Sequence, residues 1–93
     1  MPIKMNNKQI DLDTSGLRDW LVHYICSVLE MPDSPFPTSD HFDSYGLDSQ
    51  ETVIMAGVME EEFGFQIDPV TLFENPSIDQ LVAYFYEQGR IKQ

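Results

Sequence analysis

Asp48 and Ser49 are the residues whose types and position best suit chemistry. They follow a turn that closes on Gly46, and they precede an apolar periodic stretch that runs to about Phe63. Asp and Ser are typical of helix N-termini, because a side-chain oxygen accepts a bond from a backbone N–H left unpaired there. A hydroxyl beside a carboxylate, at the positive end of a helix dipole, is well placed to carry a phosphate ester.

A catalytic serine is the first alternative. Ser49, with His23 or His41 and a carboxylate, supplies the residue types of a triad. However, Leu47 stands where the first glycine of a Gly-x-Ser-x-Gly elbow is needed, and the chain is small for a catalytic cleft. The sequence therefore predicts a non-catalytic protein.

Metal binding is not predicted either. His23 has no second His or Cys at ligand spacing, and we expect it at the surface or its boundary. Three aspartates near Gly46 suggest a calcium loop. With this glycine in the invariant position, however, ligand places one, five and twelve fall on His41, Tyr45 and Thr52. The register of a calcium-binding loop therefore fails.

The charge balance excludes two classes of partner. Sixteen acidic residues stand against five basic ones, for a net charge of −11, and no Lys or Arg occurs between Asp19 and Gly89. Nucleic acids and anionic membranes require the opposite balance. We expect partners with basic protein surfaces, and association that weakens as salt rises.

The remaining composition indicates a soluble cytoplasmic monomer. The single cysteine, Cys26, falls in an apolar helical stripe and is expected to be a buried hydrophobe in a reducing compartment. No apolar run approaches a membrane span, and the N-terminus lacks the apolar core of a signal peptide.

Apolar periodicity predicts an all-α fold, a small four-helix bundle of three main helices and one short helix. A long, proline-rich loop separates the first two helices and is expected to be pinned by aromatic residues. The expected helices run from Leu17 to Leu29, from Ser49 to Phe63, for one or two turns after Asp68, and from Ile78 to about Gly89.

These elements set the expected limits of the domain. We expect residues 1–14 to form a flexible arm, 15–90 the folded domain and 91–93 a C-terminal tail. Ser15-Gly16 is the expected cap of the first helix.

The second helix has two distinct faces. The predicted core stripe consists of Thr52, Val53, Met55, Ala56, Met59 and Phe63. A second face carries Gln50, Ile54, Gly57 and Glu61. A glycine in mid-helix costs about 1 kcal/mol relative to Ala. Gly57 therefore needs a reason, either a closely packed backbone or room for a partner.

Three blocks of sequence together resemble the acyl carrier proteins, over roughly residues 17–88. The blocks are Gly46-Leu47-Asp48-Ser49, Met59-Glu60-Glu61-Glu62-Phe63-Gly64, and Leu72-Phe73-Glu74-Asn75-Pro76-Ser77-Ile78 with Leu81. The third block is most similar to carriers of polyketide and nonribosomal peptide assembly lines. An Asp directly before the serine favours an acyl carrier over a peptidyl carrier.

The resemblance implies that a phosphopantetheinyl transferase attaches 4′-phosphopantetheine from coenzyme A to Ser49, and that Asp48 assists its recognition. An acyl-loading enzyme (a ligase or an acyltransferase) and downstream synthase enzymes would then dock through basic patches. The residues expected to face these partners are Gln50, Ile54, Gly57, Glu60 and Glu61. Gln50 departs from the family, which commonly has Leu there, and Ile54 and Gly57 also alter the partner face. Together these departures suggest a dedicated enzyme set.

The expected function is therefore an acyl carrier that holds thioester intermediates in polyketide, secondary-metabolite or specialised fatty acid biosynthesis. Two alternatives stay open. The cargo could be an aminoacyl or peptidyl group of a nonribosomal pathway, or the chain could be an acidic docking module whose Ser49 is never modified.

Overall fold

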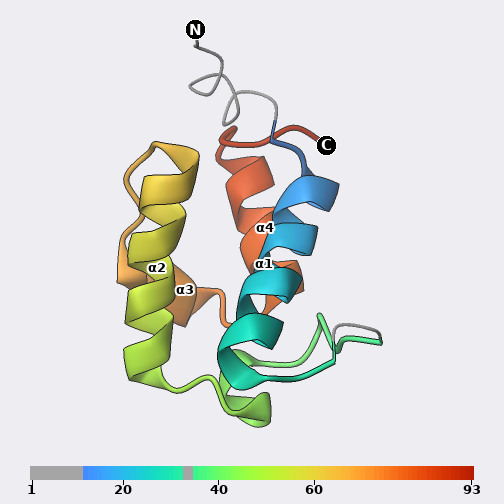
Figure 1. Ribbon diagram of the computed structural model, residues 1–93. Helices are drawn as coiled ribbons and strands as arrows, with labels where there is room; N and C mark the ends of the chain where they lie inside the picture. Colours follow the sequence, from blue (N-terminus) through green and yellow to red (C-terminus); the bar gives the residue numbers. More distant parts are fainter. Residues whose placement is uncertain (1–11, 33–34) are drawn as a thin grey trace, which may run out of the picture.

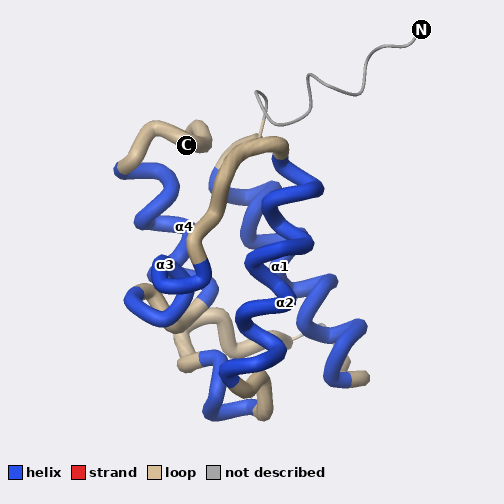
Figure 2. The backbone as a smooth tube through the Cα atoms, turned by 90° about the vertical axis from the view of Figure 1, so that its left-hand side faces the viewer, coloured by secondary structure: helices blue, strands red, loops and turns tan. Residues whose placement is uncertain are grey.

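The helices account for most of the computed structural model, which describes residues 12–32 and 35–93. Within that part of the chain, four α-helices and one 3₁₀ turn are joined by loops, without a strand (Figures 1 and 2). The elements are α1 (Thr14–Leu29), η3 (Phe42–Tyr45), α2 (Ser49–Phe63), α3 (Pro69–Glu74) and α4 (Ile78–Glu87). The predicted all-α bundle, with one short helix and a long first loop, is confirmed. None of these helices has the length and apolar character needed to cross a bilayer.

The start of α1 differs from the prediction. Asp13 caps the helix, and its Oδ1 accepts a bond from the Gly16 N–H at 2.7 Å. The expected cap, Ser15-Gly16, already lies inside the helix. The Asp13 carboxylate, two residues before Ser15, is the cap because it reaches the unpaired N–H groups of the first turn. At the other end, Glu30 adopts a left-handed conformation and its N–H donates to the Cys26 carbonyl.

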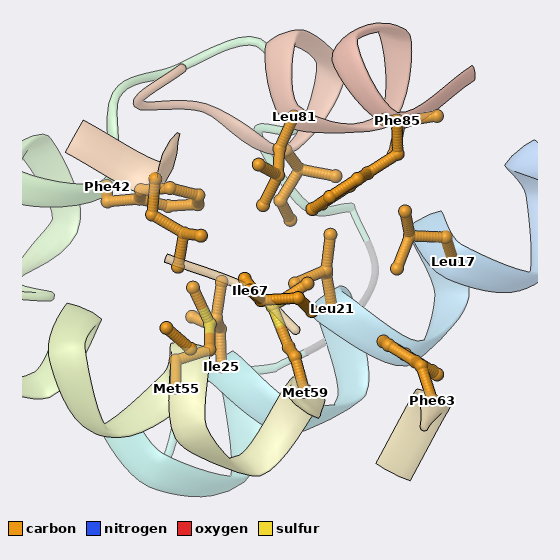
Figure 3. Packing of buried hydrophobic residues seen from close by; sticks show 14 of the residues in the cluster. Leu17, Leu21, Ile25, Phe42, Met55, Met59, Phe63, Ile67, Leu81 and Phe85 are labelled. Carbon is orange, nitrogen blue, oxygen red and sulfur yellow. The ribbon is translucent and has the colours of Figure 1, made fainter. Parts of the chain in front are cut away.

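The hydrophobic core lies between the inner faces of α1, α2 and α4, where side chains from all three converge (Figure 3). Burying one such side chain contributes about 1.5–3 kcal/mol. The central members are fully buried: Leu21 and Ile25 from α1, Met55 and Met59 from α2, and Leu81 from α4. The two methionines are therefore part of the ordinary core.

One member of the predicted core stripe of α2 is misplaced. Val53 is 45% exposed, whereas Thr52 and Ala56 beside it are buried. At 100° per residue, Val53 is turned away from the row that contains Met55, Met59 and Phe63. The apolar surface of α2 thus extends beyond the side that packs on α1 and α4.

The folded part of the chain is longer than predicted at both ends. The Lys92 N–H donates to the Leu12 carbonyl at 3.0 Å, and Ile91 is buried in the core at 6% exposure. The predicted limits, 15–90, are therefore too narrow, and the expected C-terminal tail is wrong. Residues 1–11 of the expected arm lie outside the described residues.

The loop between α1 and α2 is held to the bundle by aromatic side chains, as predicted. Phe42 is buried, and the Phe36 and Tyr45 rings pack edge to face at 5.1 Å. The Phe42 N–H also donates to the Pro76 carbonyl at 2.7 Å, which ties the loop to the start of α4. This anchoring fixes the place where α2 begins.

Candidate functional site

Ser49 is the first residue of α2. This helix begins at the end of the molecule opposite the start of α1 and the C-terminus (Figure 1). The Ser49 side chain is exposed. Asp48 is the N-cap, and its Oδ1 accepts a bond from the Glu51 N–H at 2.9 Å. The predicted pair of cap and exposed hydroxyl at a helix N-terminus is present.

The turn before α2 explains why Ser49 lies at the surface. Gly46 ends η3 with φ 105°, a left-handed conformation that strains other residues, and its N–H donates to the Asp43 carbonyl. Leu47 then turns into the core, where it is 1% exposed. An anchored Leu47 leaves the next two residues at the rim of the bundle.

Thr52 stabilises the first turn of α2 from its buried side. Its Oγ1 donates to the Asp48 carbonyl at 2.9 Å, and the residue is 3% exposed. This bond satisfies a buried hydroxyl and holds the cap residue against the helix. The first turn of α2, which carries Ser49, is therefore tied to Asp48 by the bonds from Glu51 and Thr52.

A cleft of about 200 Å³ opens beside Ser49, between α2, α3 and the loop. Ser49, Asp43 and Thr52 provide its polar lining. Its apolar lining is Phe42, Leu47, Phe73 and Pro76. Sequence reasoning missed this cleft, because Phe73 comes from another helix, 24 residues along the chain.

The predicted partner-facing residues are also brought together on the outer side of α2. Gln50, Ile54, Gly57 and Glu61 are all exposed, and Ile54 exposes 48% of its surface. A Cβ added to Gly57 would meet no atom within 4 Å, so close packing of another backbone is not the reason for this glycine.

Glu60, the fifth predicted partner-facing residue, has a local structural role. Its Oε1 accepts a bond from the Ile67 N–H at 3.1 Å, across the turn that leads from α2 to α3. The residue is exposed overall, so it lies on the surface as predicted. One of its carboxylate oxygens is nevertheless engaged within the domain.

Positive charge is absent from α2 and α3. The basic residues in the described part of the chain are Arg18 on α1 and Arg90 and Lys92 after α4. Arg18 Nε lies 3.5 Å from Asp79 Oδ1, and the Arg90 guanidinium lies 5.1 Å from the centre of the Phe65 ring. The negative charge of α2 therefore faces solvent without a neutralising side chain on the same helix.

Two tyrosines have shifted ionisation. Burial, and then the negative charge of Glu51, raises the pKa of Tyr24 above 10.0. Burial, followed by Asp40 and Cys26, raises the pKa of Tyr45 strongly. The Tyr45 hydroxyl is also buried with no hydrogen-bond partner among the described residues.

Among the described residues, no three His, Cys, Asp or Glu side chains are grouped so that they could hold a metal ion.

The site lies within a match to a protein family. Residues 19–85 match the family profile described as the phosphopantetheine attachment site. One component of the phenolphthiocerol/phthiocerol polyketide synthase of Mycobacterium tuberculosis is 32% identical over 71 residues, which is 75% of this chain. The chain spans only 4% of the length of that relative.

Two solved structures share the fold. An acyl carrier protein from Anabaena sp. PCC 7120, with a variant phosphopantetheinylation-site sequence, is 26% identical with a TM-score of 0.74, covering 82% of this chain and 86% of its own. A free-standing peptidyl carrier protein from Acinetobacter baumannii also has a TM-score of 0.74, covering 82% and 95%, at 21% identity. The second likeness concerns the fold alone.

Proposed function

Because the chain belongs to the family of phosphopantetheine attachment-site domains, which are non-catalytic carriers of covalently bound 4′-phosphopantetheine, we propose that Ser49 is its attachment residue. The observation that carries this proposal is the exposed Ser49 hydroxyl at the first position of α2. Its surroundings suit a phosphate ester, because the first turn of a helix offers unpaired N–H groups and a positive dipole end.

The fit of the group rests on two further observations. The cleft of about 200 Å³ beside Ser49 leaves open space next to this residue, so a substituent on the hydroxyl has room to extend. Ser77, by contrast, is 1% exposed and uses its Oγ to accept a bond from the Gln80 N–H. A buried, bonded hydroxyl of this kind is a poor acceptor.

The residues around Ser49 position the attachment point. Asp48 caps α2 and Leu47 anchors the turn, so the phosphodiester would be held at a fixed helix end. The bound group supplies a terminal thiol that carries cargo as a thioester. A flexible arm on a rigid domain raises the effective concentration of the cargo at each partner active site.

We propose an acyl cargo of the polyketide type. The 32% identity to a polyketide synthase component supports this, and so does the Asp that precedes Ser49. An aminoacyl cargo is the second candidate, favoured by the fold shared with a peptidyl carrier protein. Loading the phosphopantetheinylated domain with malonyl-coenzyme A and an acyltransferase, or with an amino acid, ATP and an adenylating enzyme, distinguishes them by mass.

The proposed partners are a phosphopantetheinyl transferase, an acyl-loading enzyme and downstream synthase enzymes. The exposed outer face of α2, which lacks Lys and Arg, suits docking on basic patches. Docking of this kind is weakened by salt, which allows release between steps. We place the working domain in the cytoplasm as a monomer, where coenzyme A and these enzymes can reach Ser49.

Intact mass spectrometry tests the attachment residue. The parent domain, incubated with coenzyme A and a broad-specificity transferase, is expected to gain one phosphopantetheine, and Ser49→Ala is expected to gain none. Ser44→Ala is a matched control, because Ser44 is also exposed, lies five residues away and donates its hydroxyl to the His41 carbonyl. Modification of Ser49→Ala, or no gain by a folded parent with several transferases, would contradict the proposal.

A further inference from the structure

A second cavity lies between the start of α3 and the end of α4, and we call it the α3–α4 cavity. Its volume is about 90 Å³, against about 200 Å³ for the cleft beside Ser49, and the two share no lining residue. Two of its lining residues, Ile67 and Phe85, belong to the hydrophobic core. A cavity of this size has room for several water molecules, or for one ligand of a few non-hydrogen atoms.

The other side chains that line the α3–α4 cavity are polar. They are Gln66, Asp68, Thr71, Tyr84, Gln88 and Arg90. Within the described residues, the two glutamine amides and the hydroxyls of Thr71 and Tyr84 form no hydrogen bond. These groups can donate to a ligand and accept from it without breaking a bond that the fold needs.

Arg90 and Asp68 give the α3–α4 cavity one positive and one negative group, and no ion pair joins them in the described structure. The Arg90 guanidinium lies 5.1 Å from the centre of the Phe65 ring. Such a contact uses the π face of the ring and leaves the guanidinium N–H groups available to an acceptor. Asp68 Oδ1 accepts a bond from the Val70 N–H at 3.0 Å, and a carboxylate has further lone pairs to offer.

This pair of opposite charges favours a ligand that also carries both. A guanidinium binds a carboxylate strongly, often through two parallel hydrogen bonds, and a carboxylate binds an ammonium group. A simple anion is disfavoured, because Asp68 lines the same cavity and the net charge of the chain is −11. A simple cation would lie close to Arg90. A small amino acid in its zwitterionic form meets both requirements within a few atoms.

We propose that the α3–α4 cavity binds a small free amino acid such as alanine, with its carboxylate toward Arg90 and its ammonium group toward Asp68. The site is separate from Ser49, so binding does not depend on the attachment of phosphopantetheine. A ligand of so few atoms is expected to bind with a Kd on the order of 1 mM.

The test is an NMR titration of the unmodified domain with alanine at pH 7. We expect saturable shifts of the backbone amide signals of Thr71, Gln88 and Arg90, which line the cavity. Acetate and methylammonium each carry only one of the two charges. Both are expected to bind at least about tenfold more weakly than alanine, because each lacks one charged hydrogen bond.

Arg90→Gln and Asp68→Asn test the two ends of the site. Each removes one charge, and Asn still caps a helix. Each is expected to raise the Kd of alanine at least about tenfold. Arg18→Gln and Asp19→Asn are the matched controls, because they make the same changes on α1, outside the cavity. They are expected to leave the Kd unchanged.

The proposal is overturned if alanine gives no saturable shift of the Thr71, Gln88 and Arg90 amides up to about ten times the expected Kd. It is also overturned if Arg90→Gln or Asp68→Asn, folded by its Tm, binds alanine as tightly as the parent. Equal affinity for acetate and alanine would overturn the role of Asp68. None of these outcomes bears on the assignment of Ser49, which the mass measurement tests separately.

Discussion

The α1–α4 side and the α2–α3 side of the bundle are built in different ways (Figure 1). Every Lys and Arg in the described residues lies on α1 or after α4. Four of the six large apolar side chains that stay exposed lie on the other side: Val53 and Ile54 on α2, and Val70 and Phe73 on α3. Exposed apolar groups without cations suit contact with other proteins, and we propose the α2–α3 side as the side that meets partner enzymes.

The two sides also differ in how completely contacts within the domain cover them. Arg18 on α1 reaches Asp79 on α4, and Ile91 after α4 is buried in the core. On the other side, α3 is a helix of only six residues, and the cleft beside Ser49 stays open. The α1–α4 side is therefore closed by contacts within the domain, whereas the α2–α3 side contributes to the core and also keeps an open cleft. We propose that this open side is the one available to partner enzymes.

The largest expected effect is on the free energy of unfolding, and it compares a buried residue of α1 with an exposed residue of α3. Leu21→Ala, in the core on α1, should lower the free energy of unfolding by about 2–5 kcal/mol, because it removes buried methyl groups and leaves a cavity. Val70→Ala, 53% exposed on α3, should change it by less than about 0.5 kcal/mol. Urea unfolding measures both. Equal losses would mean that the α3 surface is part of the stability of the domain.

The second prediction compares exposed apolar residues on the two sides. Ile54→Ala on α2 should raise the KM of the transferase about tenfold, equivalent to about 1.4 kcal/mol of docking energy, with an unchanged Tm. Val28→Ala on α1, where Val28 is 37% exposed, should leave KM unchanged. A similar KM for both variants would remove the functional distinction between the two sides.

The third prediction concerns Tyr45, in the loop that joins the two sides. Tyr45→Phe should stabilise the domain by up to about 1 kcal/mol at neutral pH, since it removes a buried hydroxyl without a partner among the described residues. The pKa of Tyr45 is raised in the folded state, so the folded state holds its proton where the unfolded chain releases it. Parent stability should therefore be constant below the unfolded pKa of about 10 and fall as pH rises above it.

The measurement is urea unfolding of both proteins from pH 7 to pH 11. The decline above pH 10 should be shallower in Tyr45→Phe, with the raised pKa of Tyr24 accounting for part of what remains. A lower stability of Tyr45→Phe at pH 7 would show that the hydroxyl has a partner.

The smallest expected effect concerns the ion pair between Arg18 and Asp79 on the α1–α4 side. Arg18→Gln should cost no more than about 0.5 kcal/mol, because the Arg18 and Asp79 side chains are 40% and 44% exposed and solvent screens their attraction. The loss should shrink further in 1 M salt. Thermal unfolding at two salt concentrations measures this loss. A loss above about 2 kcal/mol would indicate that the pair is a major source of stability for the packing of α1 on α4.

Local patterns predicted the elements well, because the signals that start and stop a helix act over three or four residues. Asp48 and Gly64 bound α2 as the sequence indicated, and Asp68 with Pro69 starts α3. The error at the start of α1 arose where two local candidates for the cap compete. Asp13 and Ser15 are both good cap residues, and only the folded chain shows which of them reaches an unpaired N–H.

The sequence by itself determined the all-α class, the place of Ser49 at a helix start and the acidic outer face of α2, because each depends on residues that are neighbours along one helix. Only the tertiary structure decided that Phe73 and Ser49 share a cleft, that Val53 is exposed and that Ile91 belongs to the core. These features depend on how separate helices pack, and residues far apart in sequence carry no local signal of that packing.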